Sequence, residues 1–555
     1  MQKKLLYSIL IISILIVIGT GLLLSRFIFT SKDLPKELSE NDKFRNSVIG
    51  FVREIADNYS IDQPIQHPLE LEMQGDWKIE TTIYHNGEIK GKGEEENEIL
   101  SLALEEATQR AFNDEKFKSL TKEDINNVKF LVNFKNRKFS FIEHNGEGKE
   151  LTYDSVIIRN LDKDLILQKI EQGKEFLFST EKKDEHGFYK KYDVLNDNWG
   201  DRLHTVYSAS IIYTFLYIYD FDKDENILEY VPDWGNYLLS MQNKDQGDKR
   251  YGAFHYSYYF GNKEKELKFV VGTSALSIFT LLRLYDLTAD DKYLESAKLA
   301  GDWLTTMQNS DGTMKPYVRY SDGKWLYGKQ ESLLYEGQVL SSLSKLYNVT
   351  GDKKYYDAAE GIAKRFANKY EEAGRNYVQG EYRSKNPISN SWVVMSLMDF
   401  YKTNKDDYYK DIVFELSSIV LGRQQKDTDD LLNYGRWDGA YSTSGIGWIC
   451  EVMTDTCRFC KEQKRGDCDK YKEAVVRGIR WLIQNTYSEE NTFFLENPER
   501  TIGGLFWNRS NKYIRTDSVC HALNGYTRII NDLDEGLLLS ISEKPLQEIL
   551  NNNQE

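Results

Sequence analysis

The sequence lacks a surplus of basic residues. Its 555 residues include 72 Lys and Arg against 87 Asp and Glu, which gives a formal net charge of −15 and a pI near 5.2. No segment forms the basic stripe on which a nucleic-acid-binding surface depends. The composition therefore argues against a polyanionic partner held by overall charge, and no nucleic acid is expected.

Cysteine is also scarce, with five residues in the chain. Cys450, Cys457, Cys460 and Cys468 fall within one predicted helical hairpin, whereas Cys520 stands apart. This small number allows one or two disulfides in an oxidising compartment. A bridge from Cys457 or Cys460 to Cys468 would staple the turn of that hairpin.

The first 30 residues contain a long apolar run. Residues Leu5–Leu24 are apolar or small, and as a helix they span about 30 Å, which matches the thickness of a bilayer. No small-x-small cleavage site follows the run, so residues 1–30 are expected to stay as a membrane anchor. Lys3 and Lys4 predict a cytoplasmic N-terminus and place the bulk of the chain outside the cytoplasm.

After a polar linker at residues 31–43, residues 44–160 are expected to fold as a small α+β domain. The segment DWKIETTIYHNGEIKGKG alternates like two strands joined at an Asn-Gly turn, and NEILSLALEEATQRAFNDEKF is amphipathic like a helix. Strand character returns in VKFLVNF and in KFSFIEHNGEGKELTYDSVII. This order of segments predicts a sheet packed against a helix.

Part of this domain resembles the AMMECR-type domain. The resemblance rests on HNGEIKGKG and on EEATQRAFNDEKFKSLTKEDINNVKFLV. Where that family carries LRGCIG, this chain has IKGKGE, so the family's cysteine is absent. We therefore interpret the domain as an adaptor or spacer.

From about residue 161 the chain repeats one pattern six times. A helical segment leads through a polar loop to a second, apolar helix, and a short turn starts the next pair. The second helices begin at HTVYSASIIYTF, VVGTSALSIFTL, LLYEGQVLSSLS, SWVVMSLMDFYK, SGIGWICEVMTD and DSVCHALNGYTR. Twelve helices in six hairpins predict an (α/α)6 toroid over residues 161–532, followed by a C-terminal tail at 533–555.

The connections of the predicted ring alternate in length. A long loop precedes the second helix of every pair, and a short turn follows it. Alternate connections in a ring of antiparallel hairpins lie at opposite ends, so all long loops are expected at one mouth. Function is expected there too, because binding residues concentrate on loops held by a rigid scaffold.

The long loops are rich in Tyr, Trp, Gly and Asp, as in NKDQGDKRYGAFHYSYYF and NSDGTMKPYVRYSDGKWLYG. Aromatic faces beside hydrogen-bonding groups suit sugar rings, whose C–H faces stack while their hydroxyls need polar partners. The alternative is that these aromatic side chains only plug the end of the ring.

The predicted toroid resembles a known superfamily. WGNYLLSMQNKDQG, WLTTMQNSDGT and WLIQNTYSEEN place Trp, Leu and Gln before a turn, as in the α/α-toroid proteins. These include six-hairpin glycosidases, polysaccharide lyases, sugar epimerases and terpenoid cyclases. LLYEGQVLSSLSKLYNVTGDKKYYDAAEGIAKRF is similar in particular to glucuronate 5-epimerases. The resemblance implies the fold and leaves the reaction open.

Two carboxylates near the starts of inner helices are candidate acid or base groups. Glu336 in LLYEGQV follows a long loop and is expected to point into the mouth, where the helix N-terminus favours its ionised form. Asp517 holds the matching position in the sixth pair, two residues after Arg515, and His521 lies one turn further on the same face. Such a group could bind an acidic sugar and move a proton. Structural acids, including an N-cap at Asp517, are the alternative.

Further polar and aromatic residues complete the expected rim. His204 follows Arg202 at the first inner helix and is a candidate proton partner, while Arg202 and Arg515 are candidate clamps for a substrate carboxylate. Three of the seven His in the chain, at 204, 255 and 521, are expected at this mouth, although a loop His is often merely solvated. The remaining candidate substrate-binding residues are Tyr207, His255, Tyr382, Trp437 and Asp438.

Two motifs indicate other chemistries. Cys450 and the pair Cys520-His521 are similar in type and order to the zinc ligands of lanthionine-cyclase toroids. Buried core thiols are the preferred interpretation, and no cofactor is predicted. The segment DTDD from Asp427 matches the DxDD motif of class II terpene cyclases, and such a match arises easily in an acidic chain.

The sequence thus predicts a membrane-anchored, extracytoplasmic protein whose toroid acts on or binds a polysaccharide at one mouth, with uronic-acid-containing polymers among the candidates. If the protein is an enzyme, glycoside hydrolysis, sugar epimerisation or elimination is expected. The competing class is a non-catalytic glycan-binding or assembly protein of the cell envelope.

Overall fold

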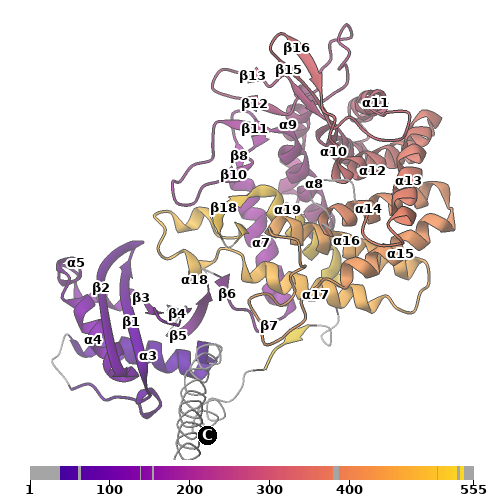
Figure 1. Cartoon of the computed structure of the whole chain (residues 1–555). Helices are drawn as coiled ribbons and strands as arrows, with labels where there is room; N and C mark the ends of the chain where they lie inside the picture. The colour runs from indigo at the N-terminus through magenta and orange to yellow at the C-terminus, as the bar shows by residue number, and fades with distance from the viewer. Residues whose placement is uncertain are drawn as a thin grey trace, which may run out of the picture. The chain divides into compact units, whose positions relative to one another are not determined.

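The computed structural model describes residues 38–39, 41–59, 64–137, 139–144, 146–152, 155–378, 387–508, 510–533 and 538–542. Its contacts divide the chain into two compact units (Figure 1). Unit 1 takes the described residues up to Ile157, Phe493–Glu496 and those after Ser540, and unit 2 takes Ile158–Thr492 and Asn497–Ser540. Part of the expected tail therefore belongs to unit 2, where β19 (Leu539–Ser540) pairs with β7 (Asn160–Leu161).

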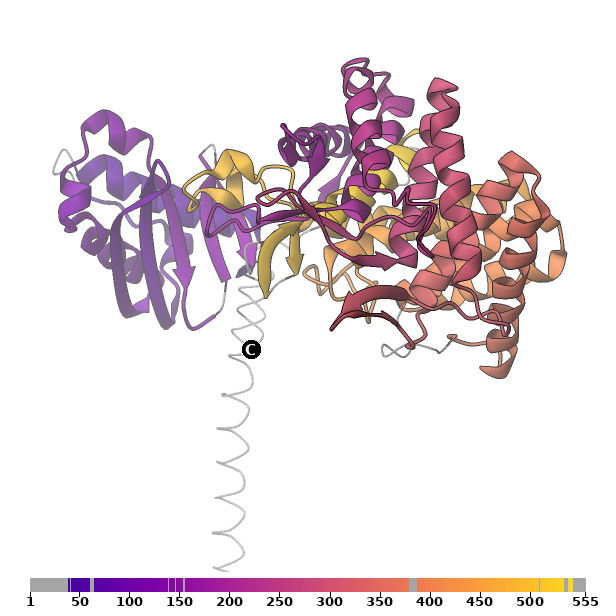
Figure 2. The same cartoon turned by 90° about the horizontal axis from the view of Figure 1, so that it is seen from above.

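Unit 1 is an antiparallel sheet covered by helices. Its six strands lie in the order β2-β1-β3-β4-β5-β6, and Figure 2 shows them side by side. The strands are β1 (Gln74–His85), β2 (Glu88–Ile99), β3 (Lys129–Phe134), β4 (Phe139–His144), β5 (Glu147–Thr152) and β6 (Ser155–Val156). The helices are α3 (Asp42–Tyr59), α4 (Leu100–Phe112), the short α5 (Glu115–Lys118) and α6 (Lys122–Asn126), and a 3-10 turn at Leu69–Leu71.

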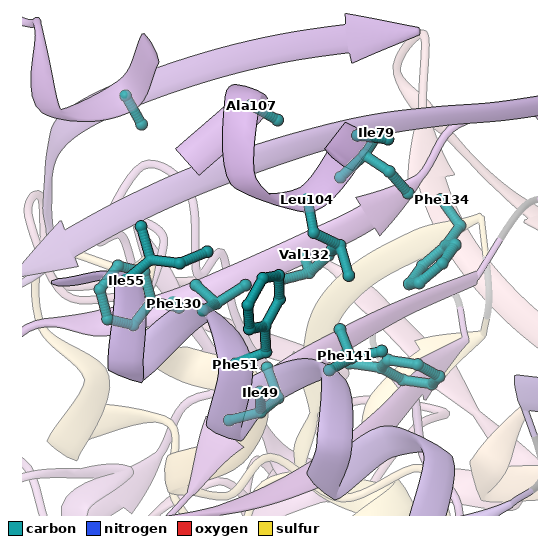
Figure 3. Close-up of a cluster of buried hydrophobic side chains, with 14 of the residues drawn as sticks. Ile49, Phe51, Ile55, Ile79, Leu104, Ala107, Phe130, Val132, Phe134 and Phe141 are labelled. Atoms are coloured by element: carbon teal, nitrogen blue, oxygen red, sulfur yellow. The ribbon is translucent and has the colours of Figure 1, made fainter. Parts of the chain in front are cut away.

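The core of unit 1 forms where α3 and α4 meet the sheet. Phe51 and Ile55 of α3 and Leu104 of α4 converge on Phe130 and Val132 of β3, and all five are buried (Figure 3). Such burial contributes about 25 cal/mol per Å² of apolar surface. Helix α4 was predicted from its amphipathic sequence, whereas α3 was not predicted.

Two features of the segment HNGEIKGKG have structural explanations. Asn86 and Gly87 both have positive φ, 51° and 78°, and form the tight turn between β1 and β2 that the Asn-Gly signal predicts. At Gly93 in β2, a Cβ atom would lie 2.0 Å from the carbonyl oxygen of Ala107 in α4. A side chain at position 93 would therefore push α4 off the sheet.

Unit 2 contains the twelve long helices of the predicted ring among its described residues. The outer helices are α7 (Lys163–Ser179), α9 (Asn226–Ser240), α11 (Asp291–Thr306), α13 (Lys353–Glu372), α15 (Asp407–Leu421) and α17 (Asp469–Gln484). The inner helices are α8 (Thr205–Asp222), α10 (Val271–Thr288), α12 (Leu333–Thr350), α14 (Pro387–Asn404), α16 (Thr443–Glu462) and α19 (Thr516–Ile529). Consecutive inner helices pack on one another and α19 packs on α8, which closes the ring.

The sequence explains how inner and outer helices differ. The outer helix α13 buries residues at helical spacing, from Tyr355 through Ile362 to Tyr370, and exposes the opposite face. The inner helix α14 is buried along almost its whole length. Short turns enter the outer helices through N-cap aspartates, because Asp290, Asp352 and Asp406 each accept a backbone N–H two residues on.

Gln242 and Gln424, which each precede a long loop, have a structural role. Gln242 donates to the carbonyl of Ser296 in α11, at 2.9 Å, and Gln424 donates to that of Ala474 in α17, at 2.7 Å. Each Gln thereby ties the end of one outer helix to the next outer helix. Gln308 makes the same kind of bond to Ala358 in α13, at 2.9 Å, so the Gln of WGNYLLSMQ and that of WLTTMQ hold neighbouring outer helices together.

The long loops meet at one end of the ring, as predicted. They carry three small sheets, each of which pairs strands from neighbouring long loops. These are β10 (Lys191–Tyr192) with β18 (Asn511–Arg515) and β17 (Phe506–Asn508); β11 (Arg202–His204) with β12 (Ser257–Tyr259) and β13 (Glu264–Lys265); and β14 (Lys268–Val270) with β15 (Tyr317–Ser321) and β16 (Lys324–Tyr327). The sixth loop pairs with the first, so the sheets also help to close the ring.

Smaller elements complete unit 2. They are β8 (Glu181–Lys182), β9 (Gly187–Phe188), α18 (Glu489–Thr492) and 3-10 turns at Pro498–Arg500 and Ile530–Asp532. Of the two disulfide pairings considered, Cys460–Cys468 is the one that forms, and it joins α16 to the start of α17. Among the described residues, no helix is both long and apolar enough to cross a membrane. The predicted anchor at residues 1–30 lies outside the described residues.

Candidate functional site

A cavity of about 540 Å³ lies inside the ring. All six inner helices contribute side chains to its wall, and Tyr256, Trp507 and Arg515 are added from the long loops. On α14 the lining extends from Ile388 in the first turn to Lys402 in the last, so the cavity follows the ring axis. Its volume lies within the range of small-molecule sites, about 300–1,000 Å³.

Arg515, Asp517 and Tyr207 form a hydrogen-bonded cluster at the mouth of the cavity. The Arg515 guanidinium donates from Nε to Asp517 Oδ1 at 3.0 Å and from Nη2 to the Tyr207 hydroxyl at 2.6 Å. Ser444 donates to Asp517 Oδ2 at 2.9 Å. Burial alone would lower the pKa of Arg515, but Asp517 beside it raises the pKa, so the guanidinium stays charged. Asp517 therefore positions Arg515 and does not cap α19.

Two tryptophans form an aromatic wall further inside. The rings of Trp392 on α14 and Trp448 on α16 are 3.8 Å apart and nearly parallel, at 15°. The ring of His521 meets Trp448 edge-on, with 5.3 Å between ring centres. All three side chains line the cavity, which gives it a flat apolar surface beside a proton carrier.

His521 is held by a buried glutamate. Its Nδ1 lies 3.0 Å from Glu451 Oε2, and Asn524 donates to the same carboxylate at 3.3 Å. Burial alone would raise the pKa of Glu451, but Arg528, 3.3 Å from Oε1, and the bond from His521 outweigh it, so the pKa is lowered. An ionised Glu451 accepts a hydrogen bond from the Nδ1–H group of His521. The other ring nitrogen, Nε2, then carries no proton and can accept one.

Charged pairs line the far end of the cavity. Lys345 Nζ lies 2.9 Å from Asp399 Oδ2, and Arg528 Nη1 lies 2.7 Å from Asp455 Oδ2. Arg528 also stacks on Tyr217, with 3.9 Å from its guanidinium carbon to the ring centre. This end of the cavity is therefore polar, and its carboxylates Asp399 and Asp455 each lie beside a cation.

Glu336 does not point into the mouth, which corrects the expectation from sequence. The cavity-lining residues of α12 are Leu334, Tyr335, Gln338, Ser341 and Lys345, and position 336 is turned about 100° from 335 around the helix. Glu336 is fully buried and accepts the Met314 N–H at 3.2 Å, while its other oxygen has no hydrogen bond. Burial and then Glu331 raise the pKa of Glu336 to about 7.

His204, Arg202 and His255 lie on the loops of the mouth but do not line the cavity. His204 packs edge-on against Tyr207 and Tyr256, and burial lowers the pKa of its imidazole to about 3. Arg202 donates to the Tyr259 hydroxyl at 2.6 Å, and the His255 ring packs on Phe269. These three side chains stabilise the loops, because each contacts other loop residues and none faces the cavity.

The last rim candidates also lie away from the cavity. Trp437 is fully buried and packs against Gly478 of α17, so it belongs to the ring wall and not to the rim. Asp438 accepts a hydrogen bond from Gln425 at 2.7 Å and does not line the cavity. Tyr382 lies outside the described residues.

Neither alternative chemistry has an assembled site in the described part of the chain. No group of three or more His, Cys, Asp or Glu there is arranged to hold a metal ion. Cys450 lies against Gly478 of α17, whereas Cys520 and His521 line the cavity. The acidic segment from Asp427 forms an exposed turn in which Asp427 caps the backbone of Asp429, and it does not line the cavity.

Sequence reasoning missed Glu451, Trp448 and Trp392, which form the wall around His521. A signal was present, because Trp448, Glu451 and Asp455 recur at helical spacing in GWICEVMTD. The same spacing links His521, Asn524 and Arg528 on α19.

Comparisons with known proteins bear on the toroid. The sequence model of glycosyl hydrolase family 76 matches residues 273–384, which contain most of α10 and all of α11, α12 and α13. No curated protein matches the chain.

Several solved structures share the fold. Cellobiose 2-epimerase from Bacillus thermoamylovorans B4167 is 13% identical, with a TM-score of 0.51, 67% of this chain covered and 100% of that chain. A sugar epimerase from a ruminal bacterium is 12% identical, with a TM-score of 0.52 and coverage of 67% and 99%. D-mannose isomerase is 15% identical, with a TM-score of 0.50 and coverage of 69% and 99%. The predicted (α/α)6 toroid is thereby confirmed, whereas the AMMECR-type resemblance of unit 1 stays a prediction.

Proposed function

We propose that the ring cavity binds a sugar unit of a glycan and that His521 transfers a proton to or from it. The observation that carries the proposal is the Glu451–His521 pair, which faces a cavity walled by Trp392 and Trp448. The match to glycosyl hydrolase family 76 over residues 273–384 supports a carbohydrate as the substrate class. Fold alone does not select the reaction.

The proposed chemistry follows from the two ends of the His521 ring. Glu451 fixes Nδ1, so Nε2 is free to accept a proton from a sugar C–H beside a carbonyl or carboxylate, or from a water molecule. The first reaction leads to epimerisation or elimination and the second to hydrolysis. General base catalysis of this kind contributes about 10²–10⁴-fold in rate.

Arg515 is the proposed clamp for an acidic sugar. Asp517 and Tyr207 hold its guanidinium in one orientation, and it lines the cavity mouth. Asp517 and Tyr207 take the hydrogens of Nε and Nη2, so Nη1 is the nitrogen that would donate to a substrate carboxylate. Uronic-acid-containing glycans are therefore the proposed substrates.

The proposed location is outside the cytoplasm, with the chain anchored through residues 1–30. The Cys460–Cys468 disulfide supports it, because structural disulfides persist in oxidising compartments. Protease treatment of intact cells tests the location. Degradation of the toroid without lysis is expected, and full protection until lysis contradicts it.

The test of the function uses His521→Gln and Glu451→Gln. Turnover and binding are measured on oligogalacturonate and on α-1,6-mannotriose as a neutral comparison. Both variants are expected to lose at least about 100-fold in kcat while glycan affinity changes little. Glu336→Gln, with its side chain outside the cavity, is the matched control and should retain turnover.

One observation favours a second candidate, a non-catalytic glycan-binding protein. The cavity-lining carboxylates of Glu451, Asp455, Asp399 and Asp517 each lie within 3.3 Å of a cation and are held in ion pairs, so none of them is placed as an unpaired general acid. Binding of oligogalacturonate without turnover, unchanged in His521→Gln, supports this candidate over the enzyme.

A further inference from the structure

The sheet β10-β18-β17 has one face that does not pack on the core of the toroid. Lys191 pairs with Arg515, and Tyr192 and Phe506 both pair with Ile514. Tyr192, Phe506 and Ile514 are buried, with at most 1% exposed. Because side chains alternate along strands, Lys191, Arg515, Tyr513 and Trp507 share the opposite face.

The second face alternates aromatic rings and cations. The rings of Trp507 and Tyr513 lie nearly parallel, at 13°, with 6.2 Å between their centres. The Arg515 guanidinium lies 4.0 Å from the centre of Trp507, and Lys191 Nζ lies 5.4 Å from that of Tyr513. Two flat apolar surfaces are thus flanked by positive charges.

This face begins in the cavity and continues beyond it. Trp507 and Arg515 line the cavity, whereas Tyr513 and Lys191 do not. A chain whose end unit fills the cavity can therefore extend over Trp507 onto Tyr513. The cavity alone, at about 540 Å³, has room for only a short piece of a polymer.

The cations of this region differ in their pairing, because Arg515 is paired with Asp517 whereas the two lysines beside it are not in an ion pair within the described part of the chain. Neither Lys190 nor Lys191 forms an ion pair or a side-chain hydrogen bond with any residue that the structure describes, and Lys190 Nζ instead lies 5.3 Å from the ring centre of Tyr207. Burial and then the nearby Arg515 lower the pKa of Lys190. Lys190 and Lys191 thus place two cations, without an ion pair in the described ranges, beside the mouth of the cavity, in a chain whose net charge is −15.

We infer that the face formed by Lys191, Tyr513 and Trp507 is an outer subsite that binds the continuing chain of an acidic glycan whose end unit lies in the cavity. The inference rests on the proposed function of the cavity and adds that the ligand is a polymer. Tyr513 and Trp507 stack on sugar rings, and Lys190 and Lys191 attract the carboxylate or sulfate groups of successive units.

The test compares a short and a long ligand. Affinities of the wild-type toroid and of Tyr513→Ala and Lys191→Gln are measured with oligogalacturonates of two and eight units. Each variant is expected to weaken binding of the octamer about 5- to 10-fold and to change binding of the dimer less than about 2-fold. Lys191→Gln should also reduce the salt dependence of octamer binding.

Lys512→Gln is the matched control, because Lys512 lies on the same strand with its side chain over Phe506 on the opposite face. It removes the same charge and should leave both affinities unchanged. A sulfated galactan octamer shows which anionic group is preferred. The inference is supported if the protein binds either acidic octamer more tightly than a neutral mannan octamer and if Lys191→Gln abolishes this difference.

Three results overturn the inference. Equal wild-type affinity for dimer and octamer, unaffected by either variant, removes the outer subsite and leaves the cavity proposal standing. Binding of an oligoglutamate peptide with the same Lys191 dependence, in place of the glycan octamer, assigns the face to a peptide. Absence of binding by any oligosaccharide, short or long, contradicts the proposed function itself.

Discussion

Two buried glutamates of the toroid, Glu336 and Glu451, ionise in opposite ways. Burial is the largest contribution to the pKa of each and raises it in both. The pKa of Glu336 is raised to about 7, whereas the pKa of Glu451 is lowered. Depth alone therefore does not decide the charge of a carboxylate in this ring.

The difference lies in the cations that each carboxylate reaches. Arg528 lies 3.3 Å from Glu451, which also accepts from His521 and Asn524. The nearest cation to Glu336 in the described part of the chain is Arg365, with Nε at 3.9 Å, and Arg365 is paired with Glu331. The well-partnered carboxylate faces the cavity, and the poorly partnered one faces the outer ring.

The largest expected effect comes from removing the cation of the cavity pair. Arg528→Met leaves the buried Glu451 and the partly buried Asp455 without their shared cation, and an unpaired buried charge typically costs about 3–5 kcal/mol. We expect this loss in the free energy of unfolding of the toroid, measured in urea at pH 7. Lys461→Met on the same side of the ring is the control, because its pair with Asp532 is partly exposed and should be worth less than about 1 kcal/mol.

A double variant sharpens the same comparison. If Arg528 stabilises the toroid mainly by neutralising Glu451, Arg528→Met combined with Glu451→Gln should recover part of the loss. Fully additive losses of the two single variants show that the ion pair is not the reason, and the argument for an ionised Glu451 then fails.

The second-largest effect comes from Glu336, whose raised pKa makes the folded protein less stable as pH rises. A carboxyl whose pKa is raised on folding stabilises the fold below its unfolded pKa, and this stability is lost as pH rises through the folded value of about 7. Glu336→Gln removes the loss, so the variant should exceed the wild type by up to ~3 kcal/mol at pH 8 and match it near pH 5. Urea unfolding at both pH values measures this, and parallel curves for the two proteins contradict it.

Much of the fold could be predicted because its elements are determined by short sequence patterns. Helical pairs, N-cap aspartates such as Asp352 and the Asn86-Gly87 turn each act over a few residues, so their sequence signals survive in the structure. The placement of the long loops followed from their order along the chain. Helix α3 was missed although its apolar residues, from Phe44 to Ala56, recur at helical spacing.

The candidate site was only partly predictable. Asp517, His521, Arg515 and Tyr207 do line the cavity, since all lie at or near an inner-helix start. The side of α12 on which Glu336 lies could not be predicted, because the polar residues of this helix, such as Gln338 and Ser344, are spread around it and do not mark one face. The role of loop aromatics such as Trp437 was predicted wrongly, because some loop side chains pack into the wall of the ring and do not face the cavity.

The smallest effect tests what keeps Glu336 apart from its arginine. Glu331 pairs with Arg365 and Lys369, and its negative charge is the second cause of the raised pKa of Glu336. In Glu331→Gln, Arg365 is free to act on Glu336, so the pKa of Glu336 should fall. The loss of stability with rising pH should then be smaller and should be complete at a lower pH. The change should stay below about 1 kcal/mol because Glu331 is partly exposed. Glu360→Gln, which removes an exposed partner of Lys364 on the same outer helix, should leave the pH midpoint unchanged. A midpoint that moves to higher pH in Glu331→Gln shows that Glu331 positions Arg365 for Glu336 instead of competing for it.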